Sequence, residues 1–588
     1  MASQRPMEYF AGSRAGSVMA EKELAEAPET QSSLPPATTR SGEFGWRVFV
    51  DAAVPPAAAI VCFAAGVGLL LSASQPNLAG RMGELLTVLP LPLVEVSHFV
   101  ASLLGMLLLF LAVGLWRRID AAWGAAILVL LAGAVFSLLK ALHWEEALSL
   151  ALIAGALMPL RRSFYRRGHM SDGLVSLPSL IAIFAVIGLA IWGLLAAYEN
   201  VPYQDDLWWT FLRDSDAPRS MRALAGAVTL GCVVAAWQII GVRQARRAAS
   251  HTTADLVRAE AIFAATREGH PDANLMFVGD KSFVFTPSGK SFVMYGRRGG
   301  LWIAMGNPVG PAEEQLDALI AFHEAADHAG KSPVIYAASD DLLPALVDLG
   351  YTIRKIGEAA CINVPAFSLE GPSRARLRQA RNRALRDGWR VEVIAPGGPV
   401  PWEALRQISD AWLKAHSGSE KAFSLGRYDA AYLARFPIAL VRQEGGGPPV
   451  AFASLWPAPG GREIAVDLMR HGPGAPNGVM DFLFLEVTLW AKTQGVEIFD
   501  LGMAPLSGLR PGRYSPALTN VGHIAYDRGE SLYGFRGLRA YKSKFAPDWQ
   551  PLFIAAPPRV SLPVALMSVA LLTSGGVLGL IRPKPSAG

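Results

Sequence analysis

Long apolar runs between residues 46 and 247 constrain this sequence more than any other feature. Each run approaches the roughly 20 residues that an α-helix needs to cross the hydrocarbon core of a bilayer. Hydrophobic residues make up 52% of the 588 residues, a high share for a protein of this size. We therefore expect a membrane domain over residues 46–247 with about six transmembrane helices, at residues 48–74, 93–115, 119–141, 144–160, 174–197 and 221–242.

Charges in the connections between these runs predict their orientation. Arginines cluster after the second, fourth and sixth predicted helices, whereas the connection before the sixth contains the acidic stretch YENVPYQDDLWW. Cytoplasmic loops of membrane proteins are enriched in Lys and Arg. We expect a multi-pass membrane protein with both termini in the cytosol.

Two segments flank the membrane and soluble parts. Residues 1–45 have no apolar period and carry acidic residues early, which predicts a disordered cytosolic tail and not a signal peptide. Residues 559–588 contain a second kind of apolar stretch, RVSLPVALMSVALLTSGGVLGLI, broken by Pro563 and three glycines. Such breaks favour a helix that packs on the soluble domain or lies at the membrane surface over a seventh crossing.

Ionisable residues lie inside or beside the predicted spans. A polar cavity for a lipid headgroup is one interpretation, and placement at helix ends, where long side chains reach water, is the favoured one. The residues are Glu95, His98, Lys140, His143, Glu145 and Glu146.

The composition becomes ordinary after Arg247, which predicts a soluble α/β domain. Strand-like stretches such as SFVFTPSGKSFVMYG and LWIAMGNPVG precede a helical period in PAEEQLDALIAFHEAADHAG. The same order recurs after Pro401, where strands are followed by a helix over residues 480–494 and the strand EIFDLGMAP. We expect two similar modules in tandem, at residues 248–395 and 396–558, with the catalytic site in the second.

Metal and cofactor patterns are weak in this sequence. The three cysteines lie far apart, and His323 and His328 are five residues apart, about 140° around a helix, so they do not share a face. The loops GNPVG and HGPGAPNG contain prolines, which lack the N–H groups that a phosphate loop uses. We expect no metal and no cofactor.

Arginines crowd the run GPSRARLRQARNRALRDGWR, where only one aspartate opposes them. A solvated helix is the plain interpretation. We favour a patch that binds phosphates of a nucleic acid backbone or of an anionic lipid, because guanidinium groups contact phosphate in a bidentate manner. The residues chosen for this patch are Arg374, Arg378 and Arg381.

The stretch VDLMRHGPGAPNGVMDFLF places Asp467 and Arg470 three residues apart in an apolar strand. Buried charges must be paired, so a structural ion pair is one interpretation of these two residues. A catalytic or binding site is the other.

A set of motifs in fixed order resembles the aminoacyl-phosphatidylglycerol synthases, the multiple peptide resistance factor family. The motifs are KIGEAACINV, FSLEG, EKAFSLGRYD, VDLMRHGPGAPNGVMDFLF, FDLGMAPLSG and YGFRGLRAYKSKFAPDWQPLFI, with LPLVEVSHFVASLLG and LKALHWEEAL in the membrane domain. The resemblance implies two acetyltransferase-like (GNAT) modules. It also implies transfer of lysine, alanine or arginine from aminoacyl-tRNA to the glycerol hydroxyl of phosphatidylglycerol. That reaction reduces the negative charge of the membrane and promotes resistance to cationic antimicrobial peptides.

The resemblance also suggests site residues. Its Asp-x-x-Arg pattern maps onto Asp467 and Arg470, and its downstream lysine onto Lys542, with Lys544 as the alternative register. We expect Arg470 and Lys542 to bind phosphate and Asp467 to orient the hydroxyl or the substrate ammonium. Weaker candidates for substrate binding are Ser424, Arg427, Asn477, Asp481 and Lys544; Asn477 as a helix cap and Asp481 as a partner of the helix dipole are the structural alternatives.

The expected partners are aminoacyl-tRNA, phosphatidylglycerol and the lipid bilayer, and an assembly of identical copies is left open. Two other functions also stay open. A lipid flippase or permease with a cytosolic binding domain would use the same membrane part, although longer family members carry additional helices for that task. A tRNA-dependent cell-wall aminoacyltransferase would share the tandem modules but lack this membrane domain.

Overall fold

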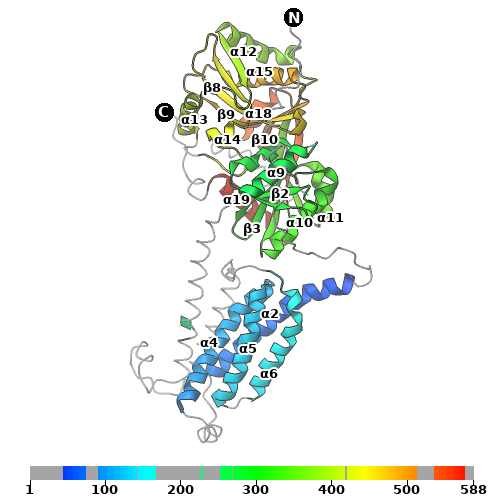
Figure 1. Cartoon of the computed structure of the whole chain (residues 1–588), viewed down its shortest axis with the longest axis vertical. Helices are drawn as coiled ribbons and strands as arrows, with labels where there is room; N and C mark the ends of the chain where they lie inside the picture. The colour runs from blue at the N-terminus through cyan, green and yellow to red at the C-terminus, as the bar shows by residue number, and fades with distance from the viewer. Residues whose placement is uncertain are drawn as a thin grey trace, which may run out of the picture. The chain divides into compact units, whose positions relative to one another are not determined.

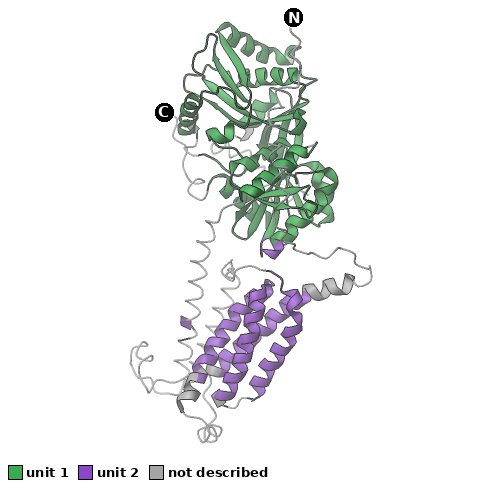
Figure 2. Ribbon diagram, in the orientation of Figure 1, with its two compact units in different colours: residues 1–31, 249–326, 332–588 green, residues 32–248, 327–331 purple. Residues whose placement is uncertain are grey.

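The chain forms two compact units in the computed structural model (Figure 2). One unit comprises residues 32–248 and 327–331, and the other comprises residues 249–326 and 332–588 together with residues 1–31. The structure describes residues 44–74, 91–141, 144–166, 226, 228, 229, 252–267, 269–416, 420–510, 512 and 535–575. The predicted N-terminal tail and the acidic connection before the sixth predicted helix lie outside these residues.

The first of these units is helical. Its helices are α2 (Phe44–Ser74), α4 (Leu91–Trp116), α5 (Asp120–Ala141) and α6 (Trp144–Leu157), followed by the 3₁₀ helix η1 (Met158–Ser163) (Figure 1). Helices α2 and α4 approach closely at two glycines, since a Cβ on Gly66 would lie 2.8 Å from the carbonyl oxygen of Gly105. Such small residues at helix contacts are typical of packing inside a bilayer.

Three of the described helices are long and apolar enough to cross a membrane, over Ala53–Ser72, Phe99–Trp116 and Asp120–Leu139. They coincide with the first three predicted spans. The fourth predicted span, 144–160, contains the 14 residues of α6 and then the start of η1 at Met158. Helix α6 is shorter than the roughly 20 residues that a crossing needs. The fifth and sixth spans lie almost wholly outside the described residues.

The second unit is built on one eleven-stranded sheet in the order β1-β2-β3-β4-β11-β5-β10-β9-β8-β7-β6. The strands from the earlier part of the chain are β1 (Ser282–Phe285), β2 (Phe292–Arg298), β3 (Leu301–Met305), β4 (Ser332–Ala338) and β5 (Thr352–Asn363). Those from the later part are β6 (Trp389–Ile394), β7 (Ile438–Gln443), β8 (Ala451–Pro457), β9 (Glu463–His471), β10 (Ile498–Pro505) and β11 (Asp548–Ala556).

The two halves of this sheet repeat one another. In each half an antiparallel run ends in a parallel pair joined by a helix: β3 and β4 through α10 (Gln315–His328), and β9 and β10 through α15 (Val479–Thr493). The halves exchange one strand, because β11 pairs with β4 and β5 pairs with β10. The predicted architecture of apolar helices followed by two similar α/β modules is therefore confirmed.

The boundary between the modules stays a prediction, with one observation bearing on it. Strand β6 lies before the expected boundary at 395/396, yet it pairs along its whole length with β7 of the second half. The second half of the sheet therefore includes residues that the sequence assigned to the first.

Helices cover both faces of the sheet. One face carries a single core that runs across both halves, built with α9 (Thr253–Ala265), the 3₁₀ helix η4 (Pro271–Val278), α13 (Trp402–His416), α14 (Ala430–Leu433) and α19 (Leu562–Thr573). The opposite face carries two cores. One lies under α10 and α11 (Leu343–Asp348), and the other under α12 (Ala375–Arg386), α15 and α18 (Phe535–Ser543). Within the C-terminal apolar stretch, Leu562–Thr573 form α19, which packs on this unit. That the stretch does not cross the membrane stays a prediction.

Candidate active site

Strand β9 carries two of the three predicted catalytic residues, Asp467 and Arg470. In a regular strand, residues three apart point to opposite faces. The register of β9 against β8 shifts between Val466 and Met469, so β9 holds one extra residue there, a β-bulge. Val466 belongs to the core under α15, whereas Leu468 belongs to the continuous core on the other face. The bulge therefore places Asp467 and Arg470 on one face, beside α13 and α14.

The carboxylate of Asp467 is surrounded by hydrogen-bond donors. The backbone N–H of Gly426 donates to Oδ1 at 2.9 Å, and the hydroxyls of Tyr432 and Ser454 donate to Oδ2 at 3.0 and 3.3 Å. Burial raises the pKa of Asp467 to about 7, although these hydrogen bonds and the charge of Arg470 act in the opposite direction. A carboxyl with such a pKa exchanges its proton near neutral pH.

Arg470 is only 4% exposed, and its partner is not Asp467. Its two terminal nitrogens donate to both oxygens of Glu420, at 2.8 and 2.7 Å, in a bidentate pair. The same guanidinium donates to the hydroxyl of Ser409 and lies 5.4 Å from the ring centroid of Trp412. Sequence reasoning missed Glu420, which belongs to the EKAFSLGRYD motif but carries no signal of its partner.

The segment 420–428, hereafter the clasp loop, is held at three points by charged side chains. Glu420 pairs with Arg470, and the N–H of Gly426 donates to Asp467. Between them the N–H of Phe423 donates to Asp280 at 2.8 Å. Asp467 and Arg470 thus fix the position of this loop, whatever else they bind.

Next to Asp280 in the sequence is a buried cation that the sequence analysis did not identify as a candidate site residue. Lys281 is completely buried, and its Nζ donates to Asp280 at 2.7 Å and lies 5.6 Å from the ring centroid of Phe423. Burial lowers the pKa of Lys281, while the charges of Asp280 and Asp467 act against that shift. The clasp loop therefore contacts the ion pair of Asp280 and Lys281, which directly precedes strand β1.

Lys542 lies on helix α18, which packs on the opposite core from Asp467. Strands β9 and β10 pair only from Ile498 to Asp500 and then part, so the following carbonyls of β10 have no partner on β9. Lys542 Nζ donates to two of them, those of Gly502 at 2.7 Å and Met503 at 3.0 Å. Burial lowers the pKa of Lys542 to about 8. No contact joins Lys542 to Asp467; the two lie near the point where the strands part.

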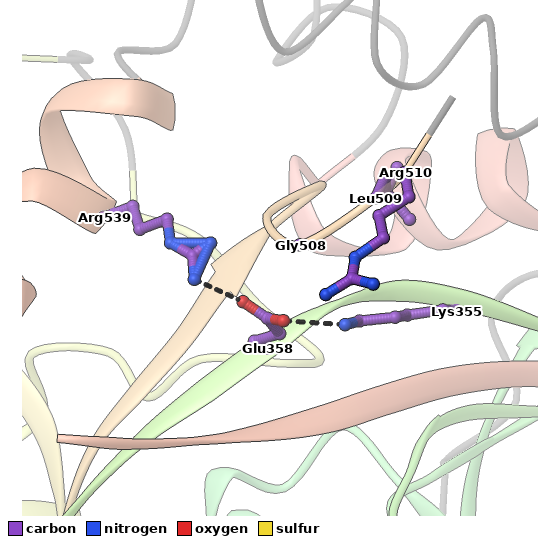
Figure 3. Close-up of a pocket in the computed structure, with 6 residues that line it drawn as sticks. All are labelled: Lys355, Glu358, Gly508, Leu509, Arg510 and Arg539. Atoms are coloured by element: carbon purple, nitrogen blue, oxygen red, sulfur yellow. Dashed lines mark hydrogen bonds and ion pairs between the residues drawn. The ribbon is translucent and has the colours of Figure 1, made fainter. Parts of the chain in front are cut away.

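A cavity of about 580 Å³ lies beside α18 (Figure 3). Three cations and one carboxylate surround it: Lys355 and Glu358 on β5, Arg539 on α18, and Arg510 in the loop after β10. Gly508 and Leu509 complete its lining. The balance of charge favours an anionic ligand.

Glu358 organises the cavity. Its carboxylate binds Lys355 Nζ at 2.7 Å and Arg539 at 3.0 Å. Lys355 and Glu358 are three apart on a strand and share a face because β5 also carries a bulge, where its register with β11 shifts. Gly508 has φ +65°, and a Cβ there would lie 1.9 Å from the Glu358 carboxylate, so only glycine fits.

The three arginines chosen for the phosphate patch make contacts inside the chain. Arg374 donates to the carbonyl of Lys544 at 3.0 Å, Arg378 to those of Leu369 and Gly371, and Arg381 pairs with Glu486 at 2.5 Å. The exposed arginines of α12 are instead Arg376, Arg383 and Arg386, which share a face at spacings of seven and three residues. A phosphate-binding patch on α12 stays a prediction, and the exposed face with Arg376, Arg383 and Arg386 is a better location for it than the three arginines chosen from the sequence.

The weaker candidates are scattered. Arg427 is exposed on the clasp loop, whereas the hydroxyl of Ser424 lies in a 3.1 Å hydrogen bond with that of Thr573 on α19. Asp481 lies in the first turn of α15 and binds Lys544 at 2.9 Å. Asn477 is exposed and is not the cap of that helix, because Gly478 occupies the N-cap position without a side-chain hydrogen bond.

Metal chemistry finds no support in the part of the chain that the structure describes. No group of three or more His, Cys, Asp and Glu side chains there could hold a metal ion. The candidate reactive groups among the described residues are the Asp467 carboxyl, the Lys542 ammonium and the cation-lined cavity. Together they suit a proton transfer and the binding of phosphate-bearing substrates.

Comparison with known proteins gives matches over much of the chain. Residues 260–556 match the family model described as "Phosphatidylglycerol lysyltransferase, C-terminal". A phosphatidylglycerol lysyltransferase of Bacillus subtilis (strain 168) is 30% identical over 517 residues, which are 87% of this chain and 59% of that protein. One from Staphylococcus epidermidis is 31% identical over 320 residues, 54% of this chain and 38% of that protein. The chain thus spans about three fifths or less of the length of these relatives.

Solved structures are also similar to part of this chain. The structure named L-PGS from Bacillus licheniformis is 33% identical, covers 54% of this chain and 96% of its own, and has a TM-score of 0.48.

Proposed function

Since the chain belongs to the family of phosphatidylglycerol lysyltransferase C-terminal domains, we propose that it transfers a lysyl group from aminoacyl-tRNA to a glycerol hydroxyl of phosphatidylglycerol. The observation that carries the proposal is the cavity of Figure 3, where Lys355, Arg510 and Arg539 surround Glu358. Arg539 of this cavity lies on α18, one helical turn before the buried Lys542. Both substrates carry phosphate, and guanidinium groups bind phosphate well.

The reaction is a transesterification. The glycerol oxygen forms a bond to the carbonyl carbon of the lysyl ester, and the bond from that carbon to the ribose oxygen of the tRNA breaks. The glycerol proton passes to the ribose oxygen. Asp467, with a pKa raised to about 7 by burial, is suited to accept this proton and return it.

The cations of the site are suited to bind or stabilise the negative charges of the substrates. Lys542 is suited to stabilise the negative charge that develops on the ester oxygen, because a buried ammonium interacts strongly with charge at short range. The arginines of the cavity hold a substrate phosphate, and the Glu358 carboxylate holds Arg539 and Lys355 in place. The two substrates approach from opposite faces of the sheet, where β9 and β10 part.

The location follows from the lipid substrate. Three helices long and apolar enough to cross a membrane keep the enzyme at a bilayer. Aminoacyl-tRNA is cytosolic, so the catalytic unit and both termini face the cytosol of a bacterial inner membrane. Addition of lysine, with two ammonium groups, changes the headgroup charge from negative to positive, which lowers attraction for cationic antimicrobial peptides.

Lipid extraction from cells tests this function. The full chain is expressed in bacteria that contain phosphatidylglycerol and lack aminoacylated lipids. We expect a new lipid positive for both phosphate and ninhydrin, whose mass exceeds that of phosphatidylglycerol by one lysyl residue. Lys542→Ala removes it, whereas Lys290→Ala, at an exposed lysine in the turn between β1 and β2, does not. A folded, membrane-inserted protein that yields no such lipid contradicts the proposal, and altered leaflet exposure of existing lipids would support a transporter.

A further inference from the structure

Helix α19 has two apolar faces, and only one of them packs on the protein. Leu562, Ala565 and Val569 are buried against the sheet. Val564 and Met567 point away and are 57% and 54% exposed. No charged residue occurs between Leu562 and Thr573, and the hydroxyl of Ser568 donates to the carbonyl of Val564 on the same helix, so the outer face is uncharged and mostly apolar.

Exposed apolar side chains are unevenly distributed over the described part of the catalytic unit. Five large ones stand out, and three of them belong to α19 and the clasp loop. These three are Val564, Met567 and Leu425, while Val257 on α9 and Val347 on α11 are the other two. A gathering of this kind in an otherwise polar surface marks an interaction site.

Hydrogen bonds connect α19 to the clasp loop. The N–H of Ala422 donates to the carbonyl of Thr573 at 2.9 Å, and the hydroxyls of Ser424 and Thr573 lie 3.1 Å apart. Met567 lies six residues before Thr573, or about 9 Å along the helix axis. Leu425, next to Ser424, therefore lies near the C-terminal end of α19, and it is exposed as Val564 and Met567 are.

Cations flank this apolar surface. Arg559 is exposed three residues before α19, and Arg427 is exposed on the clasp loop near the other end of the helix. An uncharged apolar face with basic residues at its margins is the pattern of a segment that lies in the interface of an anionic bilayer.

We propose that the outer face of α19 and Leu425 dip into the cytosolic surface of the bilayer and hold the clasp loop at the lipid. This inference rests on the proposed function for its choice of a phosphatidylglycerol-containing bilayer over a protein partner. Insertion of α19 into the bilayer surface also positions the clasp loop, which binds Asp467 and Arg470, so contact with lipid is coupled to the position of the active site. The catalytic unit thereby draws its lipid substrate from the bilayer without first extracting it into water.

Lipid-borne quenchers test the contact directly. The full chain is reconstituted in nanodiscs of phosphatidylcholine and phosphatidylglycerol, with a fluorophore attached at Met567→Cys or Val564→Cys. Interfacial helices bury their apolar face roughly 5–10 Å into the headgroup boundary, so nitroxide groups on the lipid acyl chains should quench either label at least ~3-fold more than a label at Val347→Cys. Val347, 64% exposed on α11, is the matched control, and the unmodified chain reports labelling of native cysteines.

Each outcome of this experiment either supports or overturns the proposed contact with the bilayer. Equal and weak quenching at positions 564, 567 and 347 overturns the proposal. In a parallel sample, spin labels replace the fluorophore at the same cysteines. Weak quenching together with magnetic coupling between the spin labels of two copies would show that a second copy covers this face, and that result would also overturn the proposal. The readout requires no turnover, so an inactive protein with strong quenching at positions 564 and 567 would refute the proposed function and support the contact. If one cysteine variant does not fold, the other carries the same test.

Discussion

The Asp467 carboxyl and the Lys542 ammonium set the expected pH dependence. Burial raises the pKa of Asp467 to about 7, so this group is ionised only above that pH. Burial lowers the pKa of Lys542 to about 8, so this group loses its charge above that pH. Because the reaction needs the ionised acid and the charged base, kcat/KM should rise as pH passes 7 and fall as it passes 8.

Asp467→Asn provides the check on that profile. We expect activity per folded molecule to fall roughly 10²-fold and the limb near pH 7 to disappear, since the titrating group is gone. Lys542→Ala should remove the limb near pH 8 in the same way. A variant that keeps near-normal specific activity but yields less folded protein would instead show that the residue has only a structural role.

The pair of Arg470 and Glu420 makes a second prediction at the level of single residues. Arg470→Lys and Glu420→Gln each break the bidentate contact that holds the clasp loop, so each should lower kcat/KM about 10-fold. The double variant should be no worse than either single one, because the residues act as a unit. Steady-state kinetics of the cycle measures this. A much larger loss for Arg470→Lys, multiplying with that of Glu420→Gln, would mean that Arg470 binds substrate phosphate directly.

Strand irregularities explain what the sequence could and could not predict about the site. Asp467 and Arg470 were identified through a family pattern, since strict alternation would place residues three apart on opposite faces. Bulges in β9 and β5 bring together Asp467 with Arg470 and Lys355 with Glu358. No glycine or proline marks the bulge in β9, so its residues alone do not reveal it. In β5, Gly357 lies beside the bulge, and a glycine inside a strand is a signal for a bulge that the sequence analysis did not use.

Helix α12 shows a related limit. The sequence shows that arginines crowd residues 374–390, but which of them face inward depends on packing against α15. Arg381 pairs with Glu486 there, and Arg376, Arg383 and Arg386 remain exposed.

These two sets of arginines predict different results. Replacing Arg376, Arg383 and Arg386 by Gln should raise the KM for tRNA and flatten its dependence on salt, since each phosphate contact releases counterions. Replacing Arg374, Arg378 and Arg381 should lower the midpoint of unfolding instead, because buried or half-buried contacts are lost. Kinetics across a salt series and denaturant titration separate the two. Unchanged salt dependence in the first variant would identify α12 as an ordinary solvated helix.

At the scale of the whole molecule, the pattern of apolar runs and the recurring order of strands and helices predicted the architecture. Three of the predicted spans coincide with described helices that are long and apolar enough to cross a membrane, and the two similar modules are confirmed. The exchange of β5 and β11 between the halves was not foreseen, because the residues of a strand indicate which face is buried but not which strand lies beside it. That exchange is what places Glu358, on β5, against the loop after β10.

Transfer of lysine from tRNA to lipid by the reconstituted chain is the most direct test of the account. The full chain in nanodiscs that contain phosphatidylglycerol receives tRNA charged with radioactive lysine, and the label that enters the lipid phase is counted. We expect label in a lipid that comigrates with lysyl-phosphatidylglycerol, lost when phosphatidylcholine alone is present, when the tRNA is digested beforehand, or when Lys542 is replaced by Ala. Folded, membrane-inserted protein that leaves all the label in the aqueous phase would contradict the account.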